Sequence, residues 1–314
     1  MRVLSRLKKH YTIMVKYLSK ILYFFWRIIK ALLLTYAVVF SLAGTVLIVY
    51  GYFLVSKPFR DVKFLVDHNP SQTEYMKRYR AALRAQKKPD TLLQRFVPLD
   101  SISRSLQNAV VAAEDDGFYT HPGFDIEAIL EAFEYNKDKN RIARGASTIT
   151  QQLAKNLFCD HEKNFVRKAK EMGYTLLLEK YLDKNRILEL YLNYAEWGDN
   201  IFGCEAASQA YFKKPCSRLT LNEASRLAAV LAMPSRVSPL NDKSAFIQKR
   251  VVVMANNLYR RHMLDDSGYT QLSGLPPPRD STADSTLKDT TRKVIPVGYP
   301  ENKKGIKKEK KKKR

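Results

Sequence analysis

The residues best suited to chemistry are acids that follow an apolar, alanine-rich stretch. Glu114, Asp115 and Asp116 come directly after residues 110–113, and a turn containing glycine, proline and aromatic residues follows them. A carboxyl group that emerges from an apolar surface has its charged form disfavoured, so its pKa rises toward the range useful for proton transfer. Acids at the end of a helix are also often simply solvated, which on these residues alone is the default interpretation.

A second group of polar residues follows a basic, glycine-containing loop at 137–146. Thr148 and Gln151 have the spacing of a capping box, which marks the start of a helix. Helical geometry places Gln152 and Lys155 on the same face as these two residues. The start of a helix with a lysine one to two turns in suits a phosphate group. An ordinary amphipathic surface helix is the alternative, and the many directed hydrogen-bonding groups favour a ligand site.

A further acid, Glu171, lies four residues after Arg167 and three after Lys168. Residues four apart share one face of a helix, so Arg167 and Glu171 can pair. A surface ion pair of little energetic worth is the default interpretation. The functional alternative is an acid held beside cations that could neutralise a diphosphate.

Helices must position these residues, because apolar residues recur at three- and four-residue spacing through the middle of the chain. No run alternates convincingly in the manner of a strand, so the sequence predicts a mainly α domain. Helix-length segments are predicted at 103–115, 125–135, 148–157, 164–182, 184–193, 203–212, 220–232 and 243–262.

An uncharged stretch at residues 31–55 predicts a membrane anchor. Its 25 residues exceed the roughly 20 needed to cross the hydrocarbon core. A cleaved signal peptide fits less well, because its apolar region is usually about 7–15 residues long. The eight Lys and Arg of residues 1–30 predict a cytoplasmic N-terminus, with the chain after Val55 on the outer side.

The formal charge of +23 does not point to nucleic acid. Residues 1–30 carry eight Lys or Arg and residues 302–314 carry nine, so the excess is concentrated at the two ends. A domain that reads nucleic acid would carry its basic patch in the folded middle. The three cysteines have no metal-ligand spacing, and a bridge between Cys204 and Cys216 outside the cytoplasm is the one pairing left open.

The order of the motifs resembles the peptidoglycan glycosyltransferases of the penicillin-binding-protein superfamily, over roughly residues 95–240. The motifs are ED-x-x-F-x-x-H-x-G-x-D, G-x-ST-x-TQQ-x-x-KN, RK-x-x-E and ILE-x-YLN, in that order. The segments 195–207 and 211–215 are most similar to the monofunctional biosynthetic members. Ordered motifs of this kind are more specific than any one of them.

The resemblance implies a lysozyme-like, two-lobed domain that polymerises lipid II. It implies that Glu114 is the general base that deprotonates the acceptor hydroxyl, which attacks the donor's anomeric carbon with inversion as the lipid diphosphate leaves. Glu171 is implied to assist at the leaving group, directly or through a divalent ion. The positions that match the family's diphosphate contacts are Lys155, Arg167 and Lys168, and those that match its substrate-lining residues are Ser147, Thr148, Gln151, Gln152 and Asn156.

The expected partners are lipid II, the growing glycan strand and membrane lipid, with other cell-wall synthesis proteins as further partners and no nucleic acid. No sequence feature requires a cofactor, and Mg²⁺ or another divalent cation is implied by the resemblance only. The expected organisation is a basic cytoplasmic segment at 1–30, a transmembrane helix at 31–55, a juxtamembrane connector at 56–95, a glycosyltransferase domain at 96–265 and a disordered basic tail at 266–314.

Two other functions remain open at this stage. A hydrolase or lytic transglycosylase could use two carboxylates in the same kind of cleft, although a neutral leaving group would not need Lys155, Arg167 and Lys168. A non-enzymatic scaffold that recruits cell-wall proteins through its basic ends is the second. A penicillin-binding transpeptidase domain is not expected, because the Ser-x-x-Lys at 285–288 falls in the polar tail near the end of the sequence.

Overall fold

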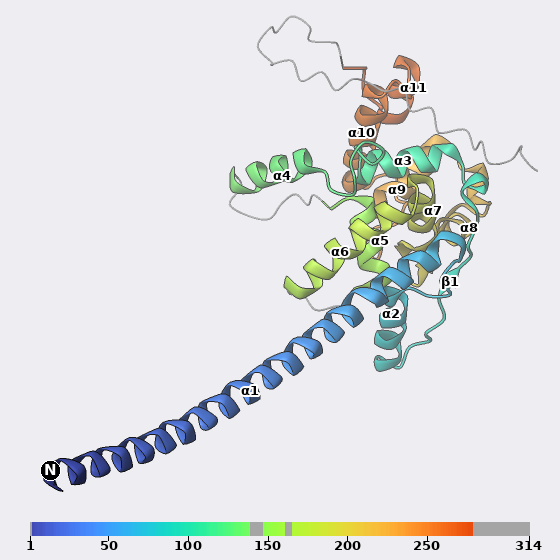
Figure 1. The fold of residues 1–314 in the computed structure, drawn as a ribbon. Helices are drawn as coiled ribbons and strands as arrows, with labels where there is room; N and C mark the ends of the chain where they lie inside the picture. Colours follow the sequence, from blue (N-terminus) through green and yellow to red (C-terminus); the bar gives the residue numbers. More distant parts are fainter. Residues whose placement is uncertain (1, 139–146, 161–164, 279–314) are drawn as a thin grey trace, which may run out of the picture. The chain divides into compact units, whose positions relative to one another are not determined.

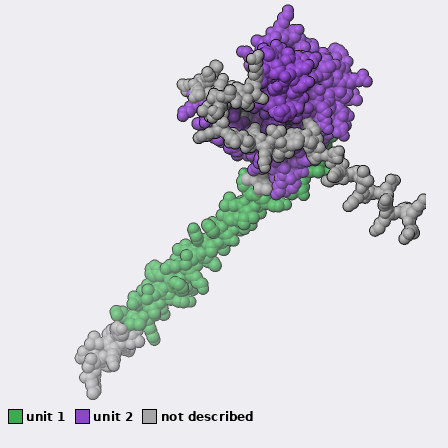
Figure 2. All heavy atoms as spheres, turned by 90° about the horizontal axis from the view of Figure 1, so that it is seen from above, with its two compact units in different colours: residues 1–70 green, residues 71–314 purple. Residues whose placement is uncertain are grey.

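The computed structural model describes residues 2–138, 147–160 and 165–278. It consists of two compact units, residues 1–70 and residues 71–314 (Figure 2). Most of the predicted basic loop at 137–146 and the lysine-rich end of the predicted tail lie outside the described residues.

The first unit is built on one helix, α1 (Arg2–Asp67), which contains the predicted span at 31–55 (Figure 1). Within the described chain it is the one helix long and apolar enough to cross a membrane. The hydroxyl groups of Thr35 and Thr45 donate to the carbonyl oxygens of Ala31 and Ser41, at 2.8 and 2.9 Å. The helix thus satisfies the hydroxyl groups of these two threonines from its own backbone, which suits a hydrocarbon environment.

The second unit is mainly α, as predicted, and each of the eight predicted helices is present. Capping boxes at Thr148–Gln151 and Thr220–Glu223 fix two of the helix starts. The eight helices are α3 (Arg104–Glu114), α4 (Ile126–Asp138), α5 (Ile149–Phe158), α6 (Phe165–Tyr181), α7 (Lys184–Tyr194), α8 (Cys204–Phe212), α9 (Leu221–Val230) and α10 (Ala245–Arg260).

Two helices fall where the sequence did not predict regular structure. The polar connector contains α2 (Glu74–Ala85), whose start is capped by the hydroxyl of Thr73. The prediction that disorder begins at residue 266 is wrong, because α11 (Asp266–Ser273) begins there, capped by Asp265. Both segments are short and polar, so the caps are their main sequence signal.

Three short strands, which the sequence did not predict, form a sheet in the order β1-β3-β2. Strand β1 (Leu93–Gln94) pairs parallel to β3 (Ile201–Phe202), and β2 (Glu196–Gly198) pairs antiparallel to β3. Strands of two or three residues are too short to show an alternating pattern. Gly203 follows β3 with a φ of 81°, and a Cβ there would lie 2.7 Å from the backbone oxygen of Asn193, so this joint requires glycine.

The core brings parts of three helices, α3, α5 and α6, near one another. Helix α3 packs against α9 and α10, while α5 packs against α6, α7 and α2 (Figure 1). Large aromatic side chains, including Tyr191 and Trp197, are fully buried between these elements. The end of α3, the body of α5 and the first half of α6 carry the acids and cations singled out in the sequence.

Cys204 and Cys216, the one pair left open by the sequence, do not form a disulfide bond. Cys204 begins α8, Cys216 begins a short 3₁₀ helix (Cys216–Arg218), and both side chains are fully buried as free thiols. The thiol of Cys216 donates to the carbonyl oxygen of Ser101 at 3.6 Å. Burial raises the pKa of Cys204 well above its ordinary value, and the nearby Cys216 adds to that rise.

Candidate active site

Glu114 is the last residue of α3, and its carboxylate is held by two other helices. Its Oε2 accepts a hydrogen bond from Nε2 of Gln152 on α5 at 3.0 Å, and its Oε1 lies 2.5 Å from Nη2 of Arg250 on α10. Burial raises the pKa of Glu114 above its ordinary value, and the nearby Arg250, Gln152 and Lys155 oppose that rise. The sequence prediction of an acid that emerges from an apolar helix is confirmed in its geometry.

Asp115, the next acid along the chain, has a structural role that differs from that of Glu114. Its Oδ1 lies 2.7 Å from Nε2 of His121, and its Oδ2 accepts from the backbone N–H of Ile149 at 2.9 Å. Nδ1 of His121 accepts from the backbone N–H of Gly123, so Nε2 carries the proton that is donated to Asp115. Asp115 therefore ties the end of α3 to the start of α5.

Asp115, His121 and Asp125 have ligand atoms within 4.8 Å of one another, a grouping that could hold a metal ion. The hydrogen bonds just described already use both oxygens of Asp115 and both ring nitrogens of His121. Oδ1 of Asp125 accepts from the backbone N–H of Ala128. The group is explained by these bonds and does not fit a hard divalent cation, which prefers several free oxygen ligands.

The start of α5 differs from the predicted phosphate cradle. Thr148 and Gln151 are buried, and each bonds to the other's backbone N–H in the capping box. The hydroxyl of Thr148 donates to the carbonyl oxygen of Gly123, and Asp115 occupies the N–H of Ile149. These groups hold the helix in place, so an anion would meet the side chains farther along α5 instead.

Gln152 links Glu114 to a buried tyrosine. Its Nε2 donates to Glu114, and its Oε1 accepts from the hydroxyl of Tyr191 on α7 at 3.0 Å. The amide is thereby fixed in one orientation and presents a donor to the carboxylate. Burial, and then the nearby charge of Glu114, raises the pKa of Tyr191 well above its ordinary value, so it remains a neutral donor.

The predicted cations gather around Glu171 on α6. The buried Glu171 accepts from Nη1 of Arg167 at 2.9 Å and from Nζ of Lys168 at 2.5 Å. Lys155 of α5 lies within electrostatic reach of these three residues and of Glu114. The Lys155 side chain is partly open to solvent. The protein packed around its amine still lowers its pKa by desolvation, and the nearby cations Arg167 and Lys168 lower it further.

Glu171 does not fit a ligand for a divalent ion, because both of its oxygens are bonded to cations. Its geometry instead holds Arg167 and Lys168 near Lys155. Of the two remaining predicted residues, Ser147 is exposed just before α5, and Asn156 is partly buried one residue after Lys155. The structure therefore brings Glu114, Gln152 and Lys155 together, with Glu171 and its cations beside Lys155.

Arg250 is the residue at this site that the sequence reasoning missed. It is part of the buried face of α10, three residues after Ile247 and four before Met254, both of which are buried. A charged residue in the middle of an apolar helix face needs a partner, and that signal could have identified it. Its Nη2 also donates to the carbonyl oxygen of Ala113 at 3.3 Å, at the end of α3.

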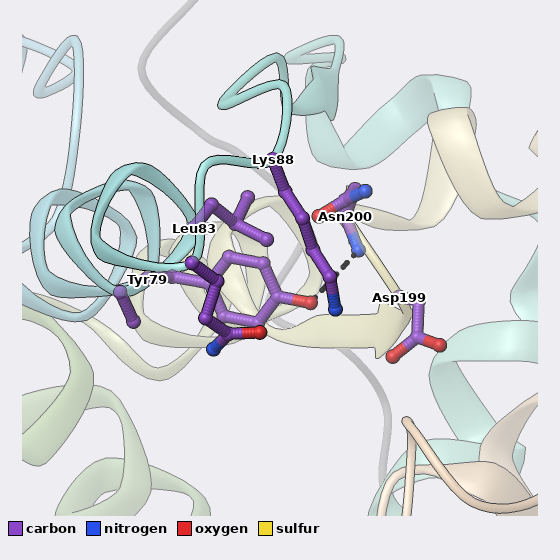
Figure 3. A pocket seen from close by; sticks show the side chains of 7 residues that line it. Tyr79, Leu83, Lys88, Asp199 and Asn200 are labelled. Atoms are coloured by element: carbon purple, nitrogen blue, oxygen red, sulfur yellow. Dashed lines mark hydrogen bonds between the residues drawn. The ribbon is translucent and has the colours of Figure 1, made fainter.

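A cavity of about 290 Å³ lies elsewhere in the same unit, between α2 and the turn that joins β2 to β3. In Figure 3, Tyr79 and Leu83 lie on one side and Asn200 and Asp199 on the other, and the side chain of Lys88 runs between them in this view. The hydroxyl of Tyr79 accepts from the backbone N–H of Asn200 at 3.2 Å. The cavity is lined by none of the predicted site residues, so it is not the site described above.

The comparisons with known proteins agree with the motif order. The sequence model of the transglycosylase family matches residues 81–258. The biosynthetic peptidoglycan transglycosylase of Thiobacillus denitrificans is 44% identical over 196 residues, covering 62% of this chain and 84% of that protein. The protein of the same name from Cupriavidus metallidurans is 49% identical, over 53% of this chain and 72% of that protein. The one from Ralstonia nicotianae is 54% identical, over 45% of this chain and 60% of that protein.

Among solved structures, penicillin-binding protein 1A from Haemophilus influenzae is similar with a TM-score of 0.32 and 19% identity, over 60% of this chain and 19% of that one. A similarity of that size adds nothing to the assignment. The family match extends from α2 to the last turns of α10 and includes every described helix that contributes to the site. The chain belongs to the transglycosylase family.

Proposed function

We propose that this chain polymerises lipid II into glycan strands, with Glu114 as the general base. As a member of the transglycosylase family it is a peptidoglycan glycosyltransferase. The observation that supports the assignment of the base is the environment of Glu114, a largely buried carboxylate whose two oxygens are held by Gln152 and Arg250. A fixed carboxylate of raised pKa is suited to take a proton from a sugar hydroxyl.

The reaction then proceeds by direct displacement. Glu114 takes the proton of the acceptor hydroxyl as the oxygen attacks the donor's anomeric carbon from the face opposite the diphosphate. The bond from the anomeric carbon to the diphosphate oxygen breaks with inversion, and undecaprenyl diphosphate leaves with the bonding electron pair. Since negative charge develops on that oxygen, cations placed in advance lower the barrier.

Lys155, Arg167 and Lys168 are the cations available for that charge. Glu171 holds Arg167 and Lys168 by ion pairs, so both are positioned before the substrate arrives. Ser147 and Asn156, at the two ends of α5, are proposed to contact the remainder of the substrate. Thr148 and Gln151 are proposed to act by holding the start of α5, because their polar groups are used in the cap.

The cations also favour synthesis over cleavage. A glycoside hydrolase protonates a sugar oxygen as it leaves and has no use for three positive charges near the bond. A reaction of purified chain with lipid II tests the proposal: a ladder of glycan polymer is the expected product. Shortening of preformed glycan would favour the lytic alternative, and no reaction on either substrate would favour the scaffold.

The chain is proposed to act at the cytoplasmic membrane, with its catalytic unit on the outer side. The support is the apolar α1 and the basic residues that precede residue 31. Apolar side chains are also exposed in the catalytic unit, where α4 stands apart from the other labelled helices (Figure 1). Surfaces of this kind suit contact with lipid or with a lipid-linked substrate. They include Ile126, Leu130 and Phe133 on α4 and Phe165, Val166 and Leu176 on α6.

Protease added to the outside of spheroplasts tests the orientation. We expect degradation of the chain after residue 55 and protection of residues 1–30, because the basic residues before the span retain the N-terminus in the cytoplasm. Lysed spheroplasts serve as the control in which both segments are cleaved. A catalytic unit that stays intact in unlysed spheroplasts would contradict the proposed topology.

A further inference from the structure

Arg250 joins α10 to the acid at the end of α3 through an ion pair between two partly buried side chains. Its Nη2 lies 2.5 Å from Oε1 of Glu114, and the side chains of the arginine and the glutamate are 26% and 10% exposed. A charge-assisted hydrogen bond between an arginine and a carboxylate is among the stronger side-chain interactions in proteins. The partners are 136 residues apart in the sequence, so only the folded unit brings them together.

The other groups around Glu114 do not replace this charge. Lys155 on α5 acts at longer range, and its own pKa is lowered by burial. Gln152 and Tyr191 are neutral, and Asp115 next along the chain is a second acid that bonds to His121 and to α5. The buried residues of α9, which also packs against α3, carry no charge. Arg250 is therefore the one cation bonded to Glu114 among the described residues.

We propose that Arg250 is a positioning residue that keeps the Glu114 carboxylate charged and fixed at the end of α3, ready to take a proton. This inference rests on the proposed role of Glu114 as the base. A buried acid without a cationic neighbour tends to be neutral at pH 7, and a neutral acid cannot act as a general base. The pairing also makes Glu114 a weaker base, because the cation stabilises the ionised form of the carboxylate.

A purely structural role is the alternative. Arg250 bonds to the carbonyl oxygen of Ala113, and Asn257 on the same helix bonds to that of Ala112, so both side chains fasten α10 to the end of α3. If that were the whole role, removing Arg250 would lower the melting temperature and the rate at every pH alike. The pH at which the rate falls on the acid side would not move.

The dependence of the polymerisation rate on pH separates the two roles in the full chain. In the wild type the rate falls as the pH drops through the pKa of Glu114. With Arg250→Gln we expect this acid limb to move up by about one to three pH units, because an adjacent opposite charge lowers the pKa of an acid by that amount. The rate should recover at higher pH, and Arg250→Lys should shift the limb less.

Lys249→Gln is the matched control, since it removes the same charge from the adjacent, exposed position of α10. Its acid limb should coincide with that of the wild type. An unshifted limb in Arg250→Gln, with the rate unchanged or uniformly lower, would overturn the inference. If Arg250→Gln fails to fold, Arg250→Met removes the same charge, and an unshifted acid limb in that variant would overturn the inference equally.

A measurement without turnover keeps this inference separate from the proposed function. The infrared band of the Glu114 carboxylate is obtained from the difference between the wild type and Glu114→Gln, and its loss with falling pH reports ionisation directly. We expect that loss at higher pH in Arg250→Gln, and an unmoved transition would refute the charge effect. Absence of polymer with the wild type would instead contradict the proposed function, and full activity of Glu114→Gln would contradict the assignment of the base.

Discussion

Replacing Glu114 by glutamine is expected to lower the rate of lipid II polymerisation by about 10²–10⁴, the usual range for removing a general base. Glutamine keeps the shape of the side chain, and its single amide oxygen can still accept from Arg250 or from Gln152, which now bond to separate oxygens of the carboxylate. It cannot take the proton of the acceptor hydroxyl. Binding of lipid II should remain close to that of the wild type, and a fluorescent lipid II assay measures both quantities.

The neighbouring Asp116 provides the control for this change. It is also an acid at the end of α3, and its Oδ1 lies 2.6 Å from Nε of Arg261, away from the contacts of Glu114. Asp116→Asn should keep the rate within a few-fold of the wild type. A Glu114→Gln enzyme that polymerises at a similar rate would refute the assignment, and the base would then have to be sought among Asp115, Asp116 and Glu171.

Replacing Lys155 by methionine should lower the rate by about 10²–10³, as expected when one preorganised group that stabilises developing charge is lost. Methionine is of similar length, so the packing of α5 is largely retained. The loss should appear mainly in kcat, because the charge on the departing diphosphate grows in the transition state. Lys180→Met, an exposed position at the far end of α6, is the control for general loss of charge.

The alkaline limb of the pH profile gives a second test of whether the charge of Lys155 is required. Burial, the largest influence, lowers its pKa, so the amine loses its charge at a lower pH than an ordinary lysine. If the charge is required, the rate falls as the pH rises through that pKa. Lys155→Arg should move this alkaline limb to higher pH, because a guanidinium stays protonated. An alkaline limb that stays in place in Lys155→Arg would show that another group causes it.

The helices could be predicted from the sequence because their signals are local. Apolar residues at three- and four-residue spacing, together with Thr148 and Thr220 at the starts, determined eight helices that the structure confirms. The short strands and the polar helices α2 and α11 carry weaker local signals. Their formation depends on neighbours that come from distant parts of the chain.

The arrangement of the site was less predictable, because helix periodicity does not say which polar group is used by the fold. Thr148 and Gln151 share a motif with Gln152, yet the first two close a cap while the third bonds to Glu114. Asp115 and Glu114 are adjacent and face different partners. The partner of Glu114 is more than a hundred residues away, a distance at which sequence spacing carries no information.

The position of Arg250 also determines where a shortened version of the enzyme can end. A fragment that stops near residue 240 retains all four motifs but removes the cation bonded to Glu114. It would leave a buried acid unpaired, which is strongly destabilising. Helix α10 is in turn tied to α11 by bonds from Tyr259 to Asp266 and from Tyr269 to Asn256. The shortest fragment that keeps these supports runs through Gly274, which ends α11.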